Sequence, residues 1–178
     1  PALLEVSKSN QTEPAIPFQP EVDTSNWKVY RNEKYGFEVS YPSGWEVKEW
    51  EEQWGWPKEE YHQFVSLYRL GSEASTYFSV EKRINPENLT LDEWFRKATV
   101  VEGRPTLTAG AKPVIINGIK FYLLDAEEEL GKLLELPNIV FEAYTANPQG
   151  DIFIIVAEAE TKDDIIILKK ILSSFRFQ

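Results

Sequence analysis

The sequence predicts an α+β domain in which a central antiparallel β-sheet is flanked by helices, an α/β/α sandwich. Three observations support this fold class. Several segments alternate apolar and polar residues with the two-residue period of strands. Two segments carry a capping residue followed by apolar residues at helical spacing. Short turn signals, among them Asn117-Gly118, separate consecutive strands and favour antiparallel pairing.

The stretch from Trp27 to Trp50 predicts a β-hairpin. Residues 37–41 alternate apolar and polar side chains, and Pro42-Ser43-Gly44 is a turn signal. Residues 45–50 then resume the alternation, as the returning arm of a hairpin does. The same alternation predicts further strands at residues 62–70 and 75–84.

A helix is predicted to begin after Thr90. Thr90 and Glu93 have the spacing of a capping box, in which each side chain serves a free backbone amide of the other residue. The apolar residues that follow lie on one helical face: Leu91, Trp94, Phe95, Ala98 and Val101. Gly103 and Pro105 are expected to end this helix.

Asn117-Gly118 is the strongest hairpin signal in the chain, and it joins predicted strands at residues 114–116 and 119–123. Residues 126–137 stay open between a loop and a helical turn. Their glutamates and leucines favour a helix, whereas Gly131 and Pro137 oppose a long one.

The C-terminal part predicts two strands and a helix. The strands cover residues 138–145 and 151–159, and both sides of the second are apolar, as in a central strand with layers above and below it. Thr161 is the expected N-cap of the last helix, with Asp164 at its third position. Its buried line is Ile165, Leu168, Ile171, Leu172 and Phe175.

Two parts of the chain differ in composition. Residues 1–26 contain four prolines among polar residues and predict a flexible tether, while residues 27–178 form the predicted domain. The longest uncharged apolar run, residues 152–157, is far shorter than the ~20 residues that span a bilayer. We expect an extracytoplasmic domain, held at a membrane only by an N-terminal anchor outside this chain. The alternative is that residues 1–26 are a trimmed end without function.

The sequence around the predicted hairpin and at the C-terminus resembles the PsbP-like family. The similar stretches are YGFEVSYPSGW at residues 35–45 and ILSSFRF at residues 171–177. This family includes the extrinsic oxygen-evolving subunit of photosystem II and bacterial lipoproteins of unassigned activity. The resemblance implies a central antiparallel sheet between helices and an exported domain, often held at a membrane by a lipidated or hydrophobic N-terminus. It assigns no functional residue.

Composition excludes several kinds of site. The chain has no cysteine and one histidine, which excludes thiolate zinc sites, cysteine nucleophiles and a two-histidine metal site within one chain. Its 178 residues carry a formal net charge of −10 without a basic run, which argues against a nucleic-acid partner or an anionic bilayer. The serine-hydrolase motif and the glycine-rich phosphate loops are missing. We therefore expect no catalytic residue, no cofactor and no resident metal.

Tryptophan is concentrated between Trp45 and Trp56. Trp45 follows the strand pattern and is expected in the core, whereas the others lie on a polar strand side or in a connection. The candidate binding residues are Trp50, Trp54, Trp56, Tyr61 and His62. Exposed aromatics there suit a sugar ring, a cationic ligand or a protein partner. The alternative is that they cover the open end of the sheet as a lid on the core.

These observations predict a non-enzymatic accessory or interaction domain whose partner is an envelope protein or a glycan. Two alternatives remain. The aromatic residues and their neighbouring acids could bind or cleave carbohydrate, since glycosidases use two carboxylates across a sugar bond. The acidic residues could also bind a divalent cation, although the calcium-loop pattern is missing. The oligomeric state stays open.

Overall fold

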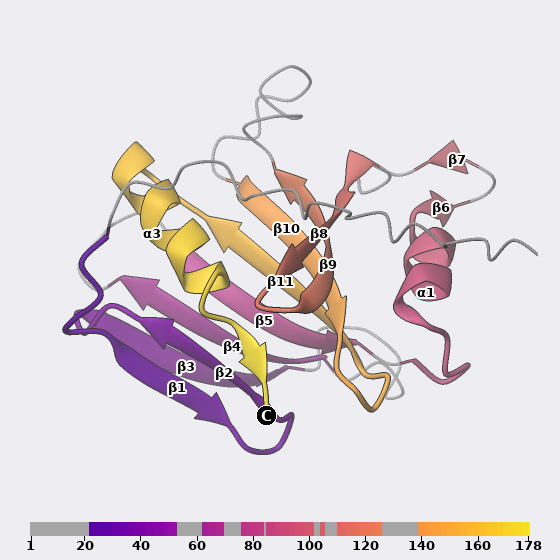
Figure 1. Ribbon diagram of the computed structural model, residues 1–178, viewed down its shortest axis with the longest axis horizontal. Coiled ribbons are helices and arrows are strands. Elements are labelled where there is room, and N and C mark those ends of the chain that lie inside the picture. The colour runs from indigo at the N-terminus through magenta and orange to yellow at the C-terminus, as the bar shows by residue number, and fades with distance from the viewer. Residues whose placement is uncertain are drawn as a thin grey trace, which may run out of the picture.

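The computed structural model describes residues 22–52, 62–69, 76–83, 85–101, 104–105, 110–125 and 139–178 (Figure 1). Within these residues the chain forms two helices, a seven-stranded sheet, a three-stranded sheet and a two-stranded ribbon. Predictions for residues 126–137 lie outside this part of the chain, as do residues 1–21 of the predicted tether. Neither described helix is long and apolar enough to cross a membrane.

The seven-stranded sheet is antiparallel throughout, with the order β3-β4-β5-β11-β10-β9-β8. Its strands are β3 (Trp45–Glu52), β4 (His62–Arg69), β5 (Tyr77–Arg83), β8 (Lys112–Ile116), β9 (Ile119–Asp125), β10 (Ile139–Ala146) and β11 (Ile152–Glu158). β11 occupies the middle of the sheet, which confirms the predicted central strand. The predicted hairpin at Asn117-Gly118 is also confirmed, with φ values of 51° and 75° at its two turn residues.

The three-stranded sheet has the order β1-β2-β12 and consists of β1 (Lys28–Asn32), β2 (Phe37–Tyr41) and β12 (Arg176–Phe177). The prediction that residues 37–41 and 45–50 form a hairpin is therefore wrong. Both segments are strands, but β2 pairs with β1 and β12 while β3 pairs with β4. The turn after Pro42 carries the chain from one sheet to the other, because alternation specifies a strand's faces and not its partner.

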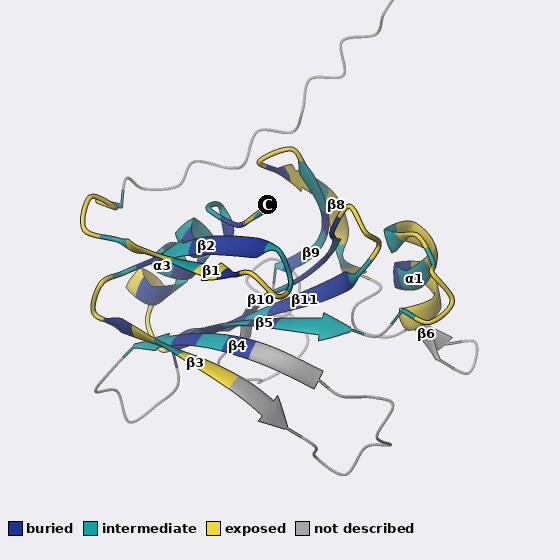
Figure 2. Cartoon of the chain, turned by 90° about the horizontal axis from the view of Figure 1, so that it is seen from below, coloured by how far each residue is buried: buried dark blue, intermediate teal, exposed yellow. Residues whose placement is uncertain are grey.

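The core lies mainly between the two sheets. β2, together with helix α3 (Lys162–Leu172), contributes to a large apolar cluster on the face of β11 that carries Phe153 and Ile155. The alternate residue Ile154 joins a smaller cluster with Tyr144 and with Phe95 of helix α1 (Leu91–Ala98). Figure 2 shows the three-stranded sheet and α3 over the same face of the large sheet. The fold is thus mostly antiparallel sheet with two helices, and a second sheet that the sequence did not predict.

Helix α1 begins as predicted and ends earlier. The capping box is present, with the Thr90 hydroxyl accepting from the Glu93 amide. The prediction that the helix continues to Val101 is wrong, because α1 ends at Ala98. Val100 and Val101 instead form strand β6 (Val100–Val101), which pairs with β7 (Arg104–Pro105). The β-branched run after Ala98 favours extended backbone over helix.

Replacing Thr90 by alanine is expected to lower the free energy of unfolding by about 1 kcal/mol. The Thr90 side chain both accepts from the Glu93 amide and donates to the Glu93 carboxylate, at 3.3 and 2.7 Å. Urea denaturation followed by circular dichroism measures the effect. Thr90→Ser is the control and should retain most of the stability, since it keeps the hydroxyl. Equal stability of Thr90→Ala and the wild type would contradict this role.

Candidate functional site: an end groove and an arginine–glutamate ladder

The structure leaves the predicted aromatic site untested. Trp54, Trp56 and Tyr61 lie outside the described residues, and only the backbone of Trp50 and His62 is described. The backbone register pairs Trp50 with Phe64 and Glu52 with His62 in strands β3 and β4. The proposed contacts of these five residues with a sugar, a cation or a protein therefore stay predictions. Trp45 is buried in the core, as expected.

A groove of about 520 Å³ lies at one end of the sheets, and we call it the end groove. It is lined by four chain segments: the start of α1 (Thr90, Leu91, Asp92), the β8–β9 turn with the start of β9 (Asn117, Gly118, Ile119, Lys120), the β10–β11 connection (Ala146, Asn147, Pro148) and β12 (Arg176, Phe177). These segments meet because the turns of the antiparallel hairpins β8–β9 and β10–β11 fall at the same end of the large sheet. The lining combines positively charged groups, a negatively charged group, side-chain amides and apolar groups.

An ion pair fixes one wall of the end groove. The Lys120 ammonium lies 2.5 Å from the Asp92 carboxylate, which also accepts a 3.0 Å hydrogen bond from the Tyr122 hydroxyl. The hydrogen bond from Lys120, and then that from Tyr122, lower the pKa of Asp92, and the Asp92 carboxylate raises the pKa of Lys120. Both groups are therefore charged at neutral pH.

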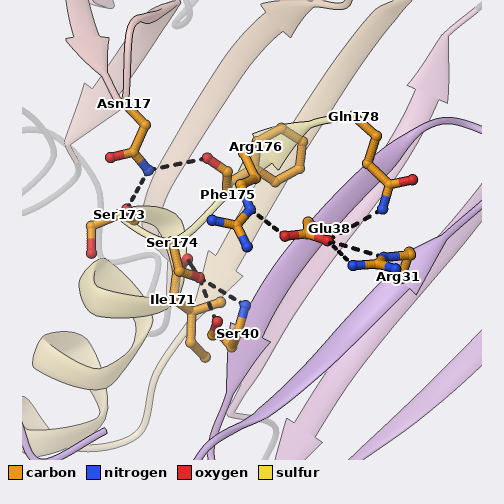
Figure 3. Close-up of polar contacts among 10 residues, drawn as sticks. All are labelled: Arg31, Glu38, Ser40, Asn117, Ile171, Ser173, Ser174, Phe175, Arg176 and Gln178. Carbon is orange, nitrogen blue, oxygen red and sulfur yellow. Dashed lines mark hydrogen bonds and ion pairs between the residues drawn. The ribbon is translucent and has the colours of Figure 1, made fainter.

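Asn117 holds a second part of the groove lining. Its side-chain amide donates to the backbone oxygens of Ser173 and Phe175, at 2.6 and 3.3 Å, and so ties the β8–β9 turn to the chain leading into β12 (Figure 3). The same turn residue therefore supplies the left-handed backbone of the hairpin and an anchor for the C-terminal strand.

A row of charged residues crosses the three-stranded sheet beside the groove, and we call it the arginine–glutamate ladder. Arg31 of β1 and Arg176 of β12 are both paired in register with Glu38 of β2. Figure 3 shows the two guanidinium groups on opposite sides of the Glu38 carboxylate. Arg31 donates from Nε and Nη2 to Oε2 at 3.0 and 2.9 Å, and Arg176 donates from Nε to Oε1. Gln178 adds a 3.2 Å hydrogen bond to Oε2.

Burial within the ladder is uneven. The Glu38 side chain is 5% exposed, whereas those of Arg31 and Arg176 are 58% and 64% exposed. The arginines thus cover the carboxylate and remain on the surface themselves. The hydrogen bonds from Arg31, and then from Arg176, lower the pKa of Glu38 against the opposing effect of desolvation.

Replacing Glu38 by glutamine is expected to lower the free energy of unfolding by about 2 kcal/mol at neutral pH, because charge-assisted hydrogen bonds are lost. A carboxylate with a lowered pKa stabilises the folded state above about pH 4.3, and this contribution disappears as the pH falls through the folded-state pKa. The difference in stability between the wild type and Glu38→Gln should therefore shrink on acidification.

Urea denaturation at a series of pH values measures this difference. The exposed Glu33→Gln is the matched control and should differ little from the wild type at neutral pH. A difference in stability between the wild type and Glu38→Gln that is constant or grows towards acid pH would contradict a stabilising role for the ionised Glu38 carboxylate.

The Ser174 side chain joins strand β2 to the end of α3. The backbone amide of Ser40 donates to the Ser174 hydroxyl at 2.8 Å, and this hydroxyl donates to the Ile171 oxygen at the C-terminal end of α3 (Figure 3). The strand that carries Glu38 is therefore fixed to the C-terminal end of α3.

A second buried acid, Asp164, joins α3 to the large sheet. Its carboxylate accepts hydrogen bonds from Arg69 at 2.9 Å, from Thr76 at 3.3 Å and from the N-cap Thr161 at 2.7 Å. Thr161 was predicted as the N-cap, and the structure confirms it. The partners of Asp164 come from three separate segments, so its role is to fix the helix on the sheet. Among the described residues, no three histidine, aspartate or glutamate side chains gather into a group that could hold a metal ion.

Sequence reasoning did not single out Arg31, Glu38 or Arg176. Glu38 and Arg176 lie inside the two stretches that carry the family resemblance, at positions where strand alternation places polar residues. A charged residue at such a position is ordinarily solvent-exposed. From the sequence alone, these charged residues therefore look like those of any exposed strand face.

Comparison with known proteins gives a likeness of fold. No protein-family model matches the chain, and no curated protein matches it. The structure is similar to the solution structure of cyanobacterial PsbP (CyanoP) from Synechocystis sp. PCC 6803, with a TM-score of 0.49 and 17% sequence identity. The match covers 89% of this chain and 96% of the cyanobacterial one. The chain is thus similar in structure to a PsbP protein, the family that the two end stretches resemble in sequence.

Proposed function

We propose that this chain is a non-catalytic accessory domain that binds a segment of a protein partner in the end groove. The observation that carries the proposal is the groove itself, which four separate chain segments build at one end of the fold. Hydrogen bonds and an ion pair hold two of its walls, through Asn117 and through Asp92 with Lys120. A fixed surface of mixed polarity suits a protein partner, since binding then requires little reordering of side chains.

The acids at this end of the molecule support binding over catalysis. A general acid needs a pKa raised towards the working pH. The pKa values of Asp92 and Glu38 are both lowered, because each carboxylate accepts hydrogen bonds from a cation. These two carboxylates are suited to fixed ion pairs and poorly suited to donating a proton to a leaving group.

The proposal also places the domain outside the cytoplasm, with residues 1–26 as its tether to a membrane. Its support is the proline-rich polar composition of that segment. The proposed layering, with helices on both faces of the large sheet, is supported by the separate clusters that contain α1 and α3. Fractionation of cells that produce the full-length protein, with and without the tether, tests the location. Recovery of both forms with cytoplasmic markers would contradict it.

Site-specific photo-crosslinking tests the partner site. A photoreactive amino acid replaces Pro148, which is exposed at the rim of the end groove, in cells that produce the protein naturally. Ser43 is the control position, because it is exposed and follows the end of β2 that lies away from β12. We expect one defined protein to crosslink from position 148 and not from position 43. Equal crosslinking from both positions, or none from position 148, would contradict the proposal.

A further inference from the structure

The arginine–glutamate ladder carries more positive charge than its carboxylate neutralises. Two arginines share Glu38, so the three side chains together bear one net positive charge. The Glu38 oxygens already accept four hydrogen bonds, three at Oε2 and one at Oε1. Oε2 is therefore fully occupied as an acceptor, and the remaining guanidinium donors of Arg31 and Arg176 do not contact Glu38.

Those donors are accessible. Arg176 uses only Nε within the described residues, and in Figure 3 its two terminal nitrogens point away from Glu38. Arg31 keeps Nη1 unused within the same part of the chain. Both side chains are more than half exposed, at 58% and 64%. A guanidinium group presents its donors in a planar fork that matches an oxyanion.

The surroundings define the ligand further. Val29 lies two residues before Arg31 on the same side of β1, and at 56% exposure it is one of two exposed large apolar residues in the described part of the chain. Arg176 also lines the end groove together with Phe177. The positive charge therefore lies between an apolar side chain and the groove. This is a local exception in a chain whose formal net charge is −10.

From this arrangement we propose that Arg31 and Arg176 bind the carboxylate of an acidic, extended segment of the protein partner. One carboxylate neutralises the single excess charge of the ladder, whereas a doubly charged oxyanion would leave a negative charge beside the Glu38 carboxylate. An apolar residue of the same segment would contact Val29. The inference rests on the proposed function, since it names the chemistry of the segment that enters the end groove.

Titration of the full chain with defined probes tests the inference. The first probe is a peptide that alternates valine and glutamate, acetylated at its N-terminus and amidated at its C-terminus; the second replaces glutamate with glutamine, and the third is inorganic sulfate. NMR of the arginine Nε–H groups reports on each arginine separately. We expect the glutamate peptide to shift the signals of Arg31 and Arg176, and the glutamine peptide to leave them unchanged. The shifts should weaken with added salt, because both arginines are exposed.

Substitutions give the second readout. The double variant Arg31→Gln with Arg176→Gln should bind the glutamate peptide about tenfold more weakly than the wild type. Arg96→Gln, which removes an exposed arginine from α1, is the matched control and should bind normally. Glu38→Gln should bind more tightly, because it raises the net charge of the ladder. This gain cannot result from misfolding.

The outcomes separate the inference from the proposed function. Shifts with sulfate alone, equal shifts with both peptides, or equal weakening by Arg96→Gln would overturn the inference. If these results accompany crosslinking from position 148, the end groove remains a partner site of different chemistry. If the glutamate peptide binds as expected and position 148 gives no crosslink, the carboxylate site stands and the end groove fails as the partner site.

Discussion

Replacing Phe175 by alanine is expected to lower the free energy of unfolding by about 4 kcal/mol. Phe175 lies in the short connection from α3 to β12, and its side chain is fully buried. Its ring stacks on that of Phe37, with 5.4 Å between the ring centroids. The rings of Phe121 and Phe177 meet it edge-on, at centroid distances of 6.0 and 5.2 Å. Because Phe37 belongs to the small sheet and Phe121 to the large one, the substitution opens a cavity where the two sheets meet.

Urea denaturation monitored by fluorescence and circular dichroism measures this loss. Phe175→Leu should cost much less, since most of the buried volume is kept. Val29→Ala is the surface control and should change the stability by less than about 0.5 kcal/mol. A loss for Phe175→Ala as small as that for Val29→Ala would contradict the packing described for the two sheets.

Replacing Asp164 by alanine is expected to cost about 3 kcal/mol. The carboxylate is 1% exposed and accepts from Arg69, Thr76 and Thr161. Its removal leaves the buried Thr76 hydroxyl and a partly exposed guanidinium without this acceptor, and it weakens the cap of α3.

The neighbouring residue provides a matched control. Asp163→Ala removes an exposed carboxylate from the same helical turn and should cost less than about 1 kcal/mol, mainly through the helix dipole. Stability is again measured by urea denaturation. Similar losses for the two variants would show that the dipole, and not the three hydrogen bonds, accounts for the role of Asp164.

Local signals predicted much of the fold. The N-caps Thr90 and Thr161 act on amides three residues away, so their spacing in the sequence is enough to locate the start of each helix. Asn117-Gly118 specified its hairpin for a similar reason, because the turn needs positive φ values at both residues.

Those local signals do not identify which distant strands pair with each other. Glu38 contacts Arg176 across 138 residues of sequence, and no local pattern identifies such a partner. In the structure β2 lies between β1 and β12, while β3 pairs with β4, which is why the hairpin prediction was wrong. The candidate site depends on this pairing: Arg31 and Glu38 lie on neighbouring strands, and Arg176 completes the ladder only when the distant strand β12 lies in register with β2.

The central claim is that a protein partner occupies the end groove. Its most direct test is the dissociation constant of the crosslinked partner, measured by calorimetry with the wild type, Pro148→Trp and Ser43→Trp. Because an indole at position 148 would occupy part of the groove, we predict that Pro148→Trp binds at least about tenfold more weakly, while Ser43→Trp binds as the wild type does. Unchanged affinity for Pro148→Trp, or an equal loss for both variants, would contradict the claim.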